Sequence, residues 1–338
     1  MPEVPAAPYD SQRQGSDLLE SALFEIKRVI AGQDEMLERV LVCLLAGGHL
    51  LLEGVPGLAK TLTIKTTAQV LGGSFRRVQF TPDLVPSDLV GTRIYRPATG
   101  TFDVELGPVL CNFLLADEIN RAPAKVQSAL LEVMQERQVT IGGETHAVPR
   151  PFLVMATQNP IEQEGTYPLP EAQVDRFMLK VVVGYPSPDE ELTIAQRSLS
   201  ATPELVRVLD IDQLSELQKA TANVYVDPVV SRYAVQLATA TRDLEAAGLP
   251  QWAPYIAFGA SPRGPISMLH AARALALLRG RAYVLPQDVR ELAPDALRHR
   301  LVLSYQALAE DVTADQVIQP VIDSVLMPRL DLARQAVA

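Results

Sequence analysis

The sequence has few cysteines, few aromatic residues and no long apolar run. Cys43 and Cys111 are the two cysteines among 338 residues, and each lies in an apolar segment far from the other. They cannot form a disulfide framework or a cysteine metal cluster, so we expect two buried small side chains. No stretch reaches the roughly 18 apolar residues of a membrane span, and the N-terminal segment lacks the apolar region of a secretory signal. We therefore expect a cytoplasmic protein with no membrane span.

Basic charge is also in short supply. The chain carries 30 Lys and Arg against 40 Asp and Glu, a net charge of −10. Nonspecific binding to nucleic acid or to an anionic membrane needs a positive surface, so this balance disfavours both. Hydrophobic residues make up 48% and charged residues 21% of the chain, which is typical of a folded globular protein and not of a disordered one. The length predicts about two domains.

The first half of the chain alternates helical patterns with short apolar strands, which predicts an α/β fold with a parallel sheet covered on both faces. Two helices, Leu18–Ile30 and Glu35–Ala46, precede the sheet. Five strands are expected at His49–Glu53, Phe75–Phe80, Asn112–Leu115, Phe152–Thr157 and Met178–Val183. Two β-hairpins are expected between them, Gly91–Tyr95 with Thr101–Glu105 and Gln138–Ile141 with Glu144–Val148.

The texture of the sequence changes at its beginning and near Gly184. Residues 1–17 are rich in Pro, Ala, Ser and Gln and predict a flexible leader. Residues 18–184 are expected to form the α/β core, and Tyr185-Pro186-Ser187-Pro188 is typical of a linker. Residues 185–338 contain helical patterns separated by Pro and Gly, which predicts a second, all-helical domain.

The segment HLLLEGVPGLAKT places an apolar strand before a glycine loop and a helix, the context that a phosphate-binding P-loop requires. Glycines let the backbone turn its N–H groups toward phosphate oxygens, and the helix N-terminus adds positive charge. Lys60 would reach the β- and γ-phosphates of ATP, and the Thr61 hydroxyl would ligate Mg²⁺. Ala59 stands where the consensus has Gly, and a glycine-rich turn with an incidental lysine is the alternative. The predicted nucleotide-binding residues here are Gly54, Val55, Pro56, Gly57, Leu58, Ala59, Lys60, Thr61 and Leu62.

A second signal follows in CNFLLADEIN, an apolar strand that ends in two carboxylates. The end of a parallel strand can aim a side chain at the P-loop. Asp117 would organise Mg²⁺ and its waters, and Glu118 would act as general base on the attacking water. The alternative is a strand that runs into the acidic start of a helix.

Three polar residues complete the predicted site. Asn159 follows the fourth strand and could hold the water or sense the γ-phosphate; a simple Asn-Pro turn is the alternative. Arg176 precedes the fifth strand and could reach the ATP of a neighbouring subunit as an arginine finger, or form a salt bridge with Asp175 or Glu171. Arg263, in the second domain, could contact the γ-phosphate or simply lie on the surface.

The segments GVPGLAKT, LLADEINRAP, ATQNP, LPEAQVDRF and GASPRG, in this order, resemble the MoxR group of AAA+ ATPases. The resemblance extends from about Leu18 to Tyr305. It implies a five-stranded sheet of order 5-1-4-3-2 and a helical lid. It also implies that the first predicted hairpin is the helix-2 insert and that the second is the pre-sensor-1 hairpin. It also implies Walker A at the loop, Walker B at Asp117 and Glu118, sensor 1 at Asn159 and the arginine finger at Arg176. Arg263 would be sensor 2, acting on its own or a neighbour's nucleotide, with Gly32 and Gln33 near the adenine.

The same resemblance implies ATP and Mg²⁺ as cofactors and a homo-oligomer, typically a hexameric ring. Members of the group are thought to remodel, assemble or activate protein complexes, often with a separate partner that carries a von Willebrand factor A domain. Two alternatives remain at this stage: a nucleotide-switched scaffold with little turnover, and a DNA-associated or metal-chelatase motor subunit. The net charge disfavours the DNA motor, and the absence of an Asn-Lys-x-Asp motif disfavours a small GTPase.

Overall fold

The computed structural model describes residues 8–160, 165–201 and 203–330, so the first seven residues of the predicted leader lie outside the described residues. The helices (α, and η for 3₁₀) and strands follow one another as α1 (Pro8–Lys27), α2 (Asp34–Leu45), β1 (Leu50–Glu53), α3 (Lys60–Val70), β2 (Phe75–Gln79), α4 (Pro86–Val90), β3 (Gly91–Arg96), β4 (Thr101–Leu106), β5 (Phe113–Asp117), η1 (Ile119–Arg121), α5 (Ala124–Glu136), β6 (Gln138–Ile141), β7 (Glu144–Ala147), β8 (Leu153–Gln158), α6 (Glu171–Val174), β9 (Leu179–Val182), α7 (Pro188–Ser198), α8 (Ile211–Ala222), α9 (Pro228–Ala240), η2 (Pro250–Tyr255), β10 (Ile256–Phe258), α10 (Arg263–Leu278), α11 (Pro286–Leu297), β11 (Val302–Leu303), α12 (Tyr305–Ala309) and α13 (Ala314–Ser324).

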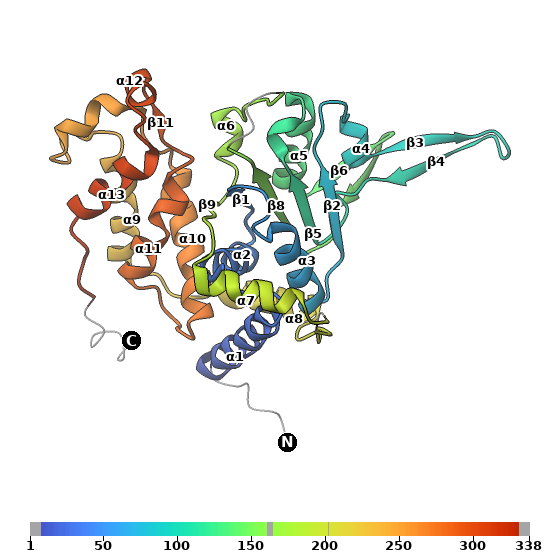
Figure 1. Ribbon diagram of the computed structural model, residues 1–338, viewed down its shortest axis with the longest axis horizontal. Helices are drawn as coiled ribbons and strands as arrows, with labels where there is room; N and C mark the ends of the chain where they lie inside the picture. The colour runs from blue at the N-terminus through green and yellow to red at the C-terminus, as the bar shows by residue number, and fades with distance from the viewer. Residues whose placement is uncertain (1–7, 161–164, 202, 331–338) are drawn as a thin grey trace. The chain divides into compact units, whose positions relative to one another are not determined.

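A five-stranded sheet of order β2-β5-β8-β1-β9 forms the centre of the fold (Figure 1). Numbered along the sheet strands alone, this is the order 5-1-4-3-2, so the predicted α/β topology is confirmed. The β2–β5, β5–β8 and β1–β8 pairs are parallel. The register pairs Gln79 with Asp117 and Glu53 with Gln158, which brings the carboxyl ends of these strands to one edge.

The three central strands β1, β5 and β8 are buried on both faces of the sheet, and successive side chains along each strand point to opposite faces. On one face, Leu51, Leu114 and Val154 belong to a cluster that includes Leu130 and Met134 of α5. The alternate residues of β1, β5 and β8 are buried as well, and the helices in contact with these strands include α2 and α3. The centre of the sheet is therefore enclosed between helices, as the nearly continuous apolar sequences of β1, β5 and β8 predict.

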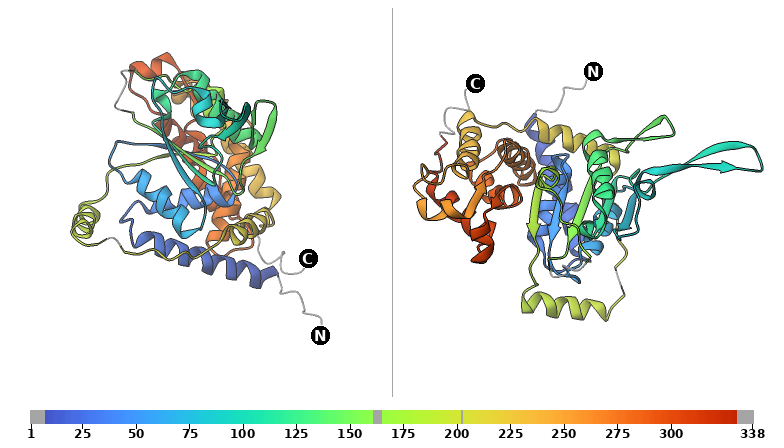
Figure 2. Two further views of the ribbon diagram at one scale, coloured as in Figure 1. Left: turned by 90° about the vertical axis from the view of Figure 1, so that its right-hand side faces the viewer. Right: turned by 90° about the horizontal axis from the view of Figure 1, so that it is seen from above.

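Two β-hairpins are inserted between the sheet strands, as predicted. The strands β3 and β4 pair from Gly91↔Leu106 to Arg96↔Thr101, and β6 pairs with β7. Figure 2 shows the β3–β4 hairpin extending away from the sheet. Tyr95 and Phe102 pack against each other on it with ring centroids 5.1 Å apart, although both side chains are more than half exposed.

The chain divides into two compact units that differ from the predicted domain boundaries. The core unit comprises 18–177 and 181–218, and the C-terminal unit comprises the described residues of 8–17, 178–180 and 219–330. The predicted join lay near Gly184, but the segment that follows it packs back on the core unit. The Val208 N–H donates to Val70 O at 2.8 Å, and the Gln218 side chain donates to Leu44 O at 2.6 Å.

The leader also differs from its prediction. Helix α1 begins at Pro8, ten residues before the predicted Leu18, so residues 8–17 are helical and not a flexible leader. Proline is tolerated in the first turn because its missing N–H would have no helical partner there. The Ser16 hydroxyl donates to Leu278 O at 3.3 Å, which ties this part of α1 to the C-terminal unit.

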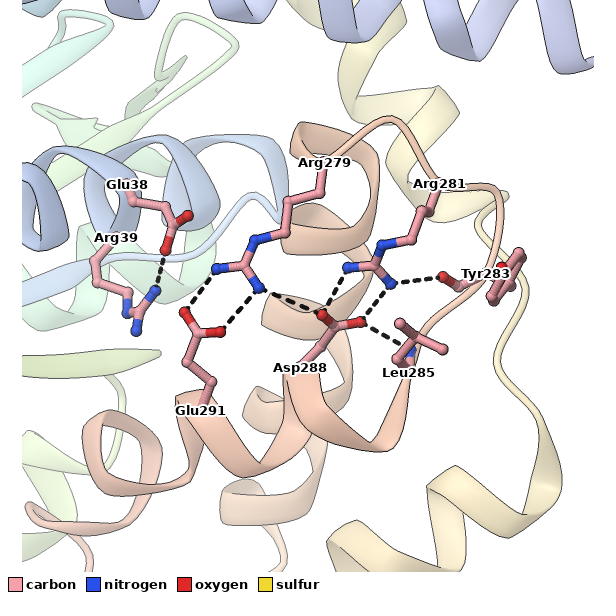
Figure 3. A network of polar contacts seen from close by, with 8 residues as sticks. All are labelled: Glu38, Arg39, Arg279, Arg281, Tyr283, Leu285, Asp288 and Glu291. Atoms are coloured by element: carbon pink, nitrogen blue, oxygen red, sulfur yellow. Dashed lines mark hydrogen bonds and ion pairs between the residues drawn. The ribbon is translucent and has the colours of Figure 1, made fainter. Parts of the chain in front are cut away.

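Among the described residues from 219 on, the C-terminal unit is mostly helical and contains a two-stranded ribbon of β10 and β11, which the prediction of an all-helical domain missed. Both strands are too short for a periodic pattern to show in the sequence. A polar network fixes α10 against α11 (Figure 3). Arg281 donates to both oxygens of the buried Asp288 at 2.6 and 2.8 Å, and Arg279 donates to Glu291.

Two further expectations concern features of the whole chain. Cys43 and Cys111 are buried free thiols, as predicted, and burial raises the pKa of the Cys111 thiol to about 12. Within the part of the chain that the structure describes, none of the helices has the length and apolar content needed to cross a bilayer.

Candidate nucleotide-binding site

The glycine loop between β1 and α3 has the backbone geometry of a tight phosphate-binding turn. Gly57 has φ +87° with open space around its α-carbon. Ala59, the residue before α3, has φ 55° and ψ 15°, in the left-handed region. That conformation costs a non-glycine residue about 1 kcal/mol, which explains why glycine is the consensus there. A Cβ on Gly54 would lie 2.6 Å from Val183 O, so only glycine lets the chain beyond β9 approach the loop.

Lys60 occupies the start of α3 with its ammonium group turned into the loop. Its Nζ donates to Gly54 O at 2.6 Å. Burial lowers the pKa of Lys60, while the nearby Asp117, Glu118 and Glu53 carboxylates act to raise it. The Lys60 ammonium is therefore partly desolvated and has three carboxylates nearby. A partly desolvated ammonium attracts a polyphosphate more strongly than one surrounded by water.

The loop and the ends of β5 and β8 enclose one cavity of about 420 Å³. It brings together the predicted Lys60, Thr61, Asp117, Glu118 and Asn159. The other predicted loop residues that line it are Gly54, Pro56, Gly57, Leu58, Ala59 and Leu62. Arg176 is half-buried just after α6 and is not among the described residues that line this cavity. Arg263 is exposed at the start of α10, in the C-terminal unit.

The Asp117 carboxylate is held at both oxygens. Its Oδ1 accepts a hydrogen bond from the Thr157 hydroxyl at 2.6 Å, and Thr157 Oγ1 in turn accepts from the Glu118 N–H at 2.8 Å. Its Oδ2 accepts from Arg77 Nη2 at 2.7 Å and from Arg77 Nε at 3.1 Å. Asp117 is therefore oriented by two neighbouring strands.

Glu118 adopts the left-handed conformation, with φ 56° and ψ 52°, directly after β5. Such strain in a non-glycine residue persists where the surrounding structure enforces it, and functional sites are common examples. Its Oε2 accepts from Gln79 Nε2 at 2.8 Å and is paired with Arg121 Nε at 3.1 Å. The carboxylate is thereby placed at the edge of the cavity.

Sequence reasoning missed Arg77, Gln79 and Thr157, which line the cavity, and Arg121 beside it. Arg77 and Gln79 lie on β2, which pairs with β5 so that Gln79 is opposite Asp117. The signal was present in the sequence, because neighbouring parallel strands end at the same edge. The family resemblance implied that these strands are neighbours, but the register that places Gln79 opposite Asp117 is not contained in any local pattern.

A second cavity of about 670 Å³ shares Gly57, Leu58, Ala59 and Leu62 with the first. Its other walls are mostly apolar and include Ile30, Ile194 and the predicted Gln33. Gln33 Nε2 donates to Gly184 O at 3.0 Å. Gly32 has φ +69°, a left-handed conformation that favours glycine, and the Glu190 side chain of α7 lies beside it. The position and apolar lining suit a nucleoside that extends from the phosphate loop.

The donor set fits a magnesium nucleotide. Mg²⁺ prefers hard oxygen ligands together with substrate phosphates, and the Thr61 hydroxyl and Asp117 carboxylate face one cavity beside Lys60. Fold and site together define a P-loop nucleotide-binding protein of the AAA class.

Comparison with known proteins identifies the family. The family model described as "ATPase family associated with various cellular activities (AAA)" matches residues 49–179, and an AAA lid domain matches 252–321. The chain is 58% identical to Chaperone MoxR1 of Mycobacterium tuberculosis over 94% of this chain and 84% of that protein. It is 43% identical to the uncharacterized protein YeaC of Bacillus subtilis over 92% of this chain and 95% of that protein. The chain belongs to the MoxR family of AAA+ ATPases.

A solved structure agrees with this assignment. The crystal structure of a putative ATPase from Cytophaga hutchinsonii superposes with a TM-score of 0.89 at 44% identity, covering 95% of this chain and 98% of that one. The predicted fold class and family resemblance are thus confirmed.

Proposed function

We propose that this protein binds ATP with Mg²⁺ and hydrolyses it to ADP and phosphate. The observation that carries the proposal is the single cavity lined by Lys60, Thr61, Asp117, Glu118 and Asn159. Lys60 would hold the β- and γ-phosphates, and Thr61 with Asp117 would hold Mg²⁺. When bound, the metal would neutralise phosphate charge.

Glu118 is the proposed general base. Its carboxylate would accept the proton of the attacking water, and Asn159, buried at the end of β8, would orient that water or sense the γ-phosphate. Gln79 and Arg121 hold Glu118 in its present position, so we expect Glu118 to leave one of them to reach the water. The nucleoside would occupy the second cavity, with Gln33 and Gly32 beside the base.

We further infer that the site is completed by a second copy of the chain. Arg176 is not among the described residues that line the cavity of its own chain. It would supply the arginine finger to the nucleotide of a neighbouring subunit in a ring. Arg263 would act as sensor 2, on its own or a neighbour's nucleotide. Residues 219–330 would serve as the lid, and we propose a cytoplasmic hexamer.

The cellular role we propose is chaperone-like remodelling, assembly or activation of partner complexes. Support comes from the relative named as a chaperone. A separate partner with a von Willebrand factor A domain would fit this role. A nucleotide-switched scaffold is the second candidate, and one observation favours it: protein side chains engage both site carboxylates, which would slow basal turnover.

Steady-state ATPase assays of the wild type and Glu118→Gln test the proposal. Glu118→Gln should bind ATP normally and lose turnover by at least about 100-fold, the usual contribution of a general base. Glu132→Gln, an exposed residue of α5, removes the same charge and should leave turnover unchanged. Unaltered turnover in Glu118→Gln would refute the base assignment. A wild type that binds ATP but stays inactive with candidate partners would favour the scaffold.

A further inference from the structure

We propose that Arg77 sets how much Mg²⁺ the nucleotide site requires, both by engaging Asp117 and by adding its own positive charge to the cavity. The inference rests on the proposed function, because it concerns the same cavity. Arg77 lies on β2, outside both the glycine loop and the Asp117-Glu118 motif.

Arg77 and Asp117 form a two-point contact. Arg77 Nη2 lies 2.7 Å and Nε 3.1 Å from the same oxygen, Asp117 Oδ2. Thr157 occupies the other oxygen, Oδ1. Both oxygens of the proposed metal-organising carboxylate are therefore engaged by protein donors, and metal or metal-bound water must share or replace one of them.

This ion pair also changes the net charge at the proposed metal site. A guanidinium stays protonated under all ordinary conditions, so Arg77 cancels the negative charge of Asp117 where Mg²⁺ is expected. The Asp117 side chain is 15% exposed and that of Arg77 is 48% exposed. Water screens the pair only in part. A divalent ion a few ångströms from the guanidinium is repelled even at the dielectric constant of water.

The position of Arg77 gives it a direct effect on the nucleotide as well. Arg77 itself lines the cavity, beside Lys60 and Thr61. Its guanidinium therefore contributes positive charge to a site built for a polyanion. The same side chain should weaken the hold on Mg²⁺ and strengthen the hold on metal-free ATP. A purely structural ion pair would affect neither.

The adjacent residue provides a matched control. Arg76 is exposed on the same strand, and its side chain points to the opposite face because strand side chains alternate. Arg76→Gln and Arg77→Gln remove the same charge from neighbouring positions, and only Arg77→Gln removes it from the cavity.

The test measures binding of a fluorescent ATP analogue to the full chain, from EDTA to millimolar Mg²⁺. In Arg77→Gln the Mg²⁺ concentration for half-maximal binding should fall about tenfold, and affinity in EDTA should fall severalfold. Arg76→Gln should match the wild type. Arg77→Lys keeps the charge without the two-point contact and should shift in the same direction by less; it carries the test if Arg77→Gln does not fold.

Equal Mg²⁺ requirements in Arg77→Gln and Arg76→Gln would overturn the inference while leaving the proposed function intact. A higher Mg²⁺ requirement in Arg77→Gln would overturn it as well, because Arg77 would then assist the metal. A wild type that binds no nucleotide at any Mg²⁺ concentration would instead refute the proposed function, and this inference with it.

Discussion

The Thr157 hydroxyl donates to Asp117 Oδ1 at 2.6 Å, across the boundary between β8 and β5. The oxygen of that hydroxyl, Thr157 Oγ1, accepts from the Glu118 N–H at 2.8 Å. Thr157→Val keeps the shape and removes both bonds, leaving the Glu118 N–H without this acceptor. We expect a loss of about 1–3 kcal/mol in stability and a clear fall in kcat, measured by denaturant unfolding and by ATPase assay.

Thr157→Ser is the matched variant, because it keeps the hydroxyl and loses only a methyl group. It should retain most of the activity. A valine variant with the stability and kcat of the wild type would show that the hydrogen-bond bridge is not needed.

Mixed oligomers test the proposed role of Arg176. Arg176→Ala and Glu118→Gln should each be inactive alone. When they are mixed, a Glu118→Gln subunit offers its intact Arg176 to an Arg176→Ala neighbour that still has Glu118. Activity should reappear and peak at intermediate ratios in ATPase assays, with assembly followed by light scattering. Mixtures that assemble and stay inactive at every ratio would argue against a finger supplied in trans.

His49 predicts acid sensitivity of the core unit. Its Nδ1 accepts from the Val154 N–H at 3.0 Å, so Nε2 carries the hydrogen and contacts Met134 O at 3.2 Å. Burial is the main reason that the pKa of His49 falls from 6.5 to about 4. A second proton on Nδ1 would face the Val154 N–H, a donor against a donor.

The folded state therefore binds fewer protons than the unfolded state between pH 6.5 and 4. Stability from this group is complete above pH 6.5 and is lost as the pH falls through this range, by about 3 kcal/mol in total. His49→Gln removes the titration, so its stability should depend less on pH than that of the wild type. Parallel pH profiles of the two proteins in denaturant unfolding would contradict the prediction.

Asp288 should matter for the stability of the C-terminal unit. It is 2% exposed and pairs with Arg281, which is 19% exposed. Asp288→Asn leaves a poorly compensated arginine and should cost about 3 kcal/mol. Asp323→Asn breaks the exposed pair with Arg290 and should cost less than about 1 kcal/mol. Equal shifts of the unfolding midpoint in urea would show that burial does not decide the cost of losing these carboxylates.

Local patterns in the sequence determined much of the fold and most of the candidate site. Alternating strand and helix patterns predicted the sheet. The composition and spacing of the glycine loop with Lys60 and Thr61 predicted the phosphate-binding site. Asp117 and Glu118 were found for the same reason, since each motif is contiguous in the chain. The predicted boundary near Gly184 differed from the two compact units because packing, and not linker composition, attaches the segment 181–218 to the core unit.

Tertiary structure decided which side chains of β2 and β8 hold the two carboxylates. Arg77 and Gln79 are about 40 residues away from Asp117 and Glu118 in the chain. They meet because β2 and β5 are parallel and in register, with Gln79 opposite Asp117. Hydrogen bonding between strands fixes that register. The sequence supplied the chemical groups of the site, and the pairing of strands brought them within bonding distance.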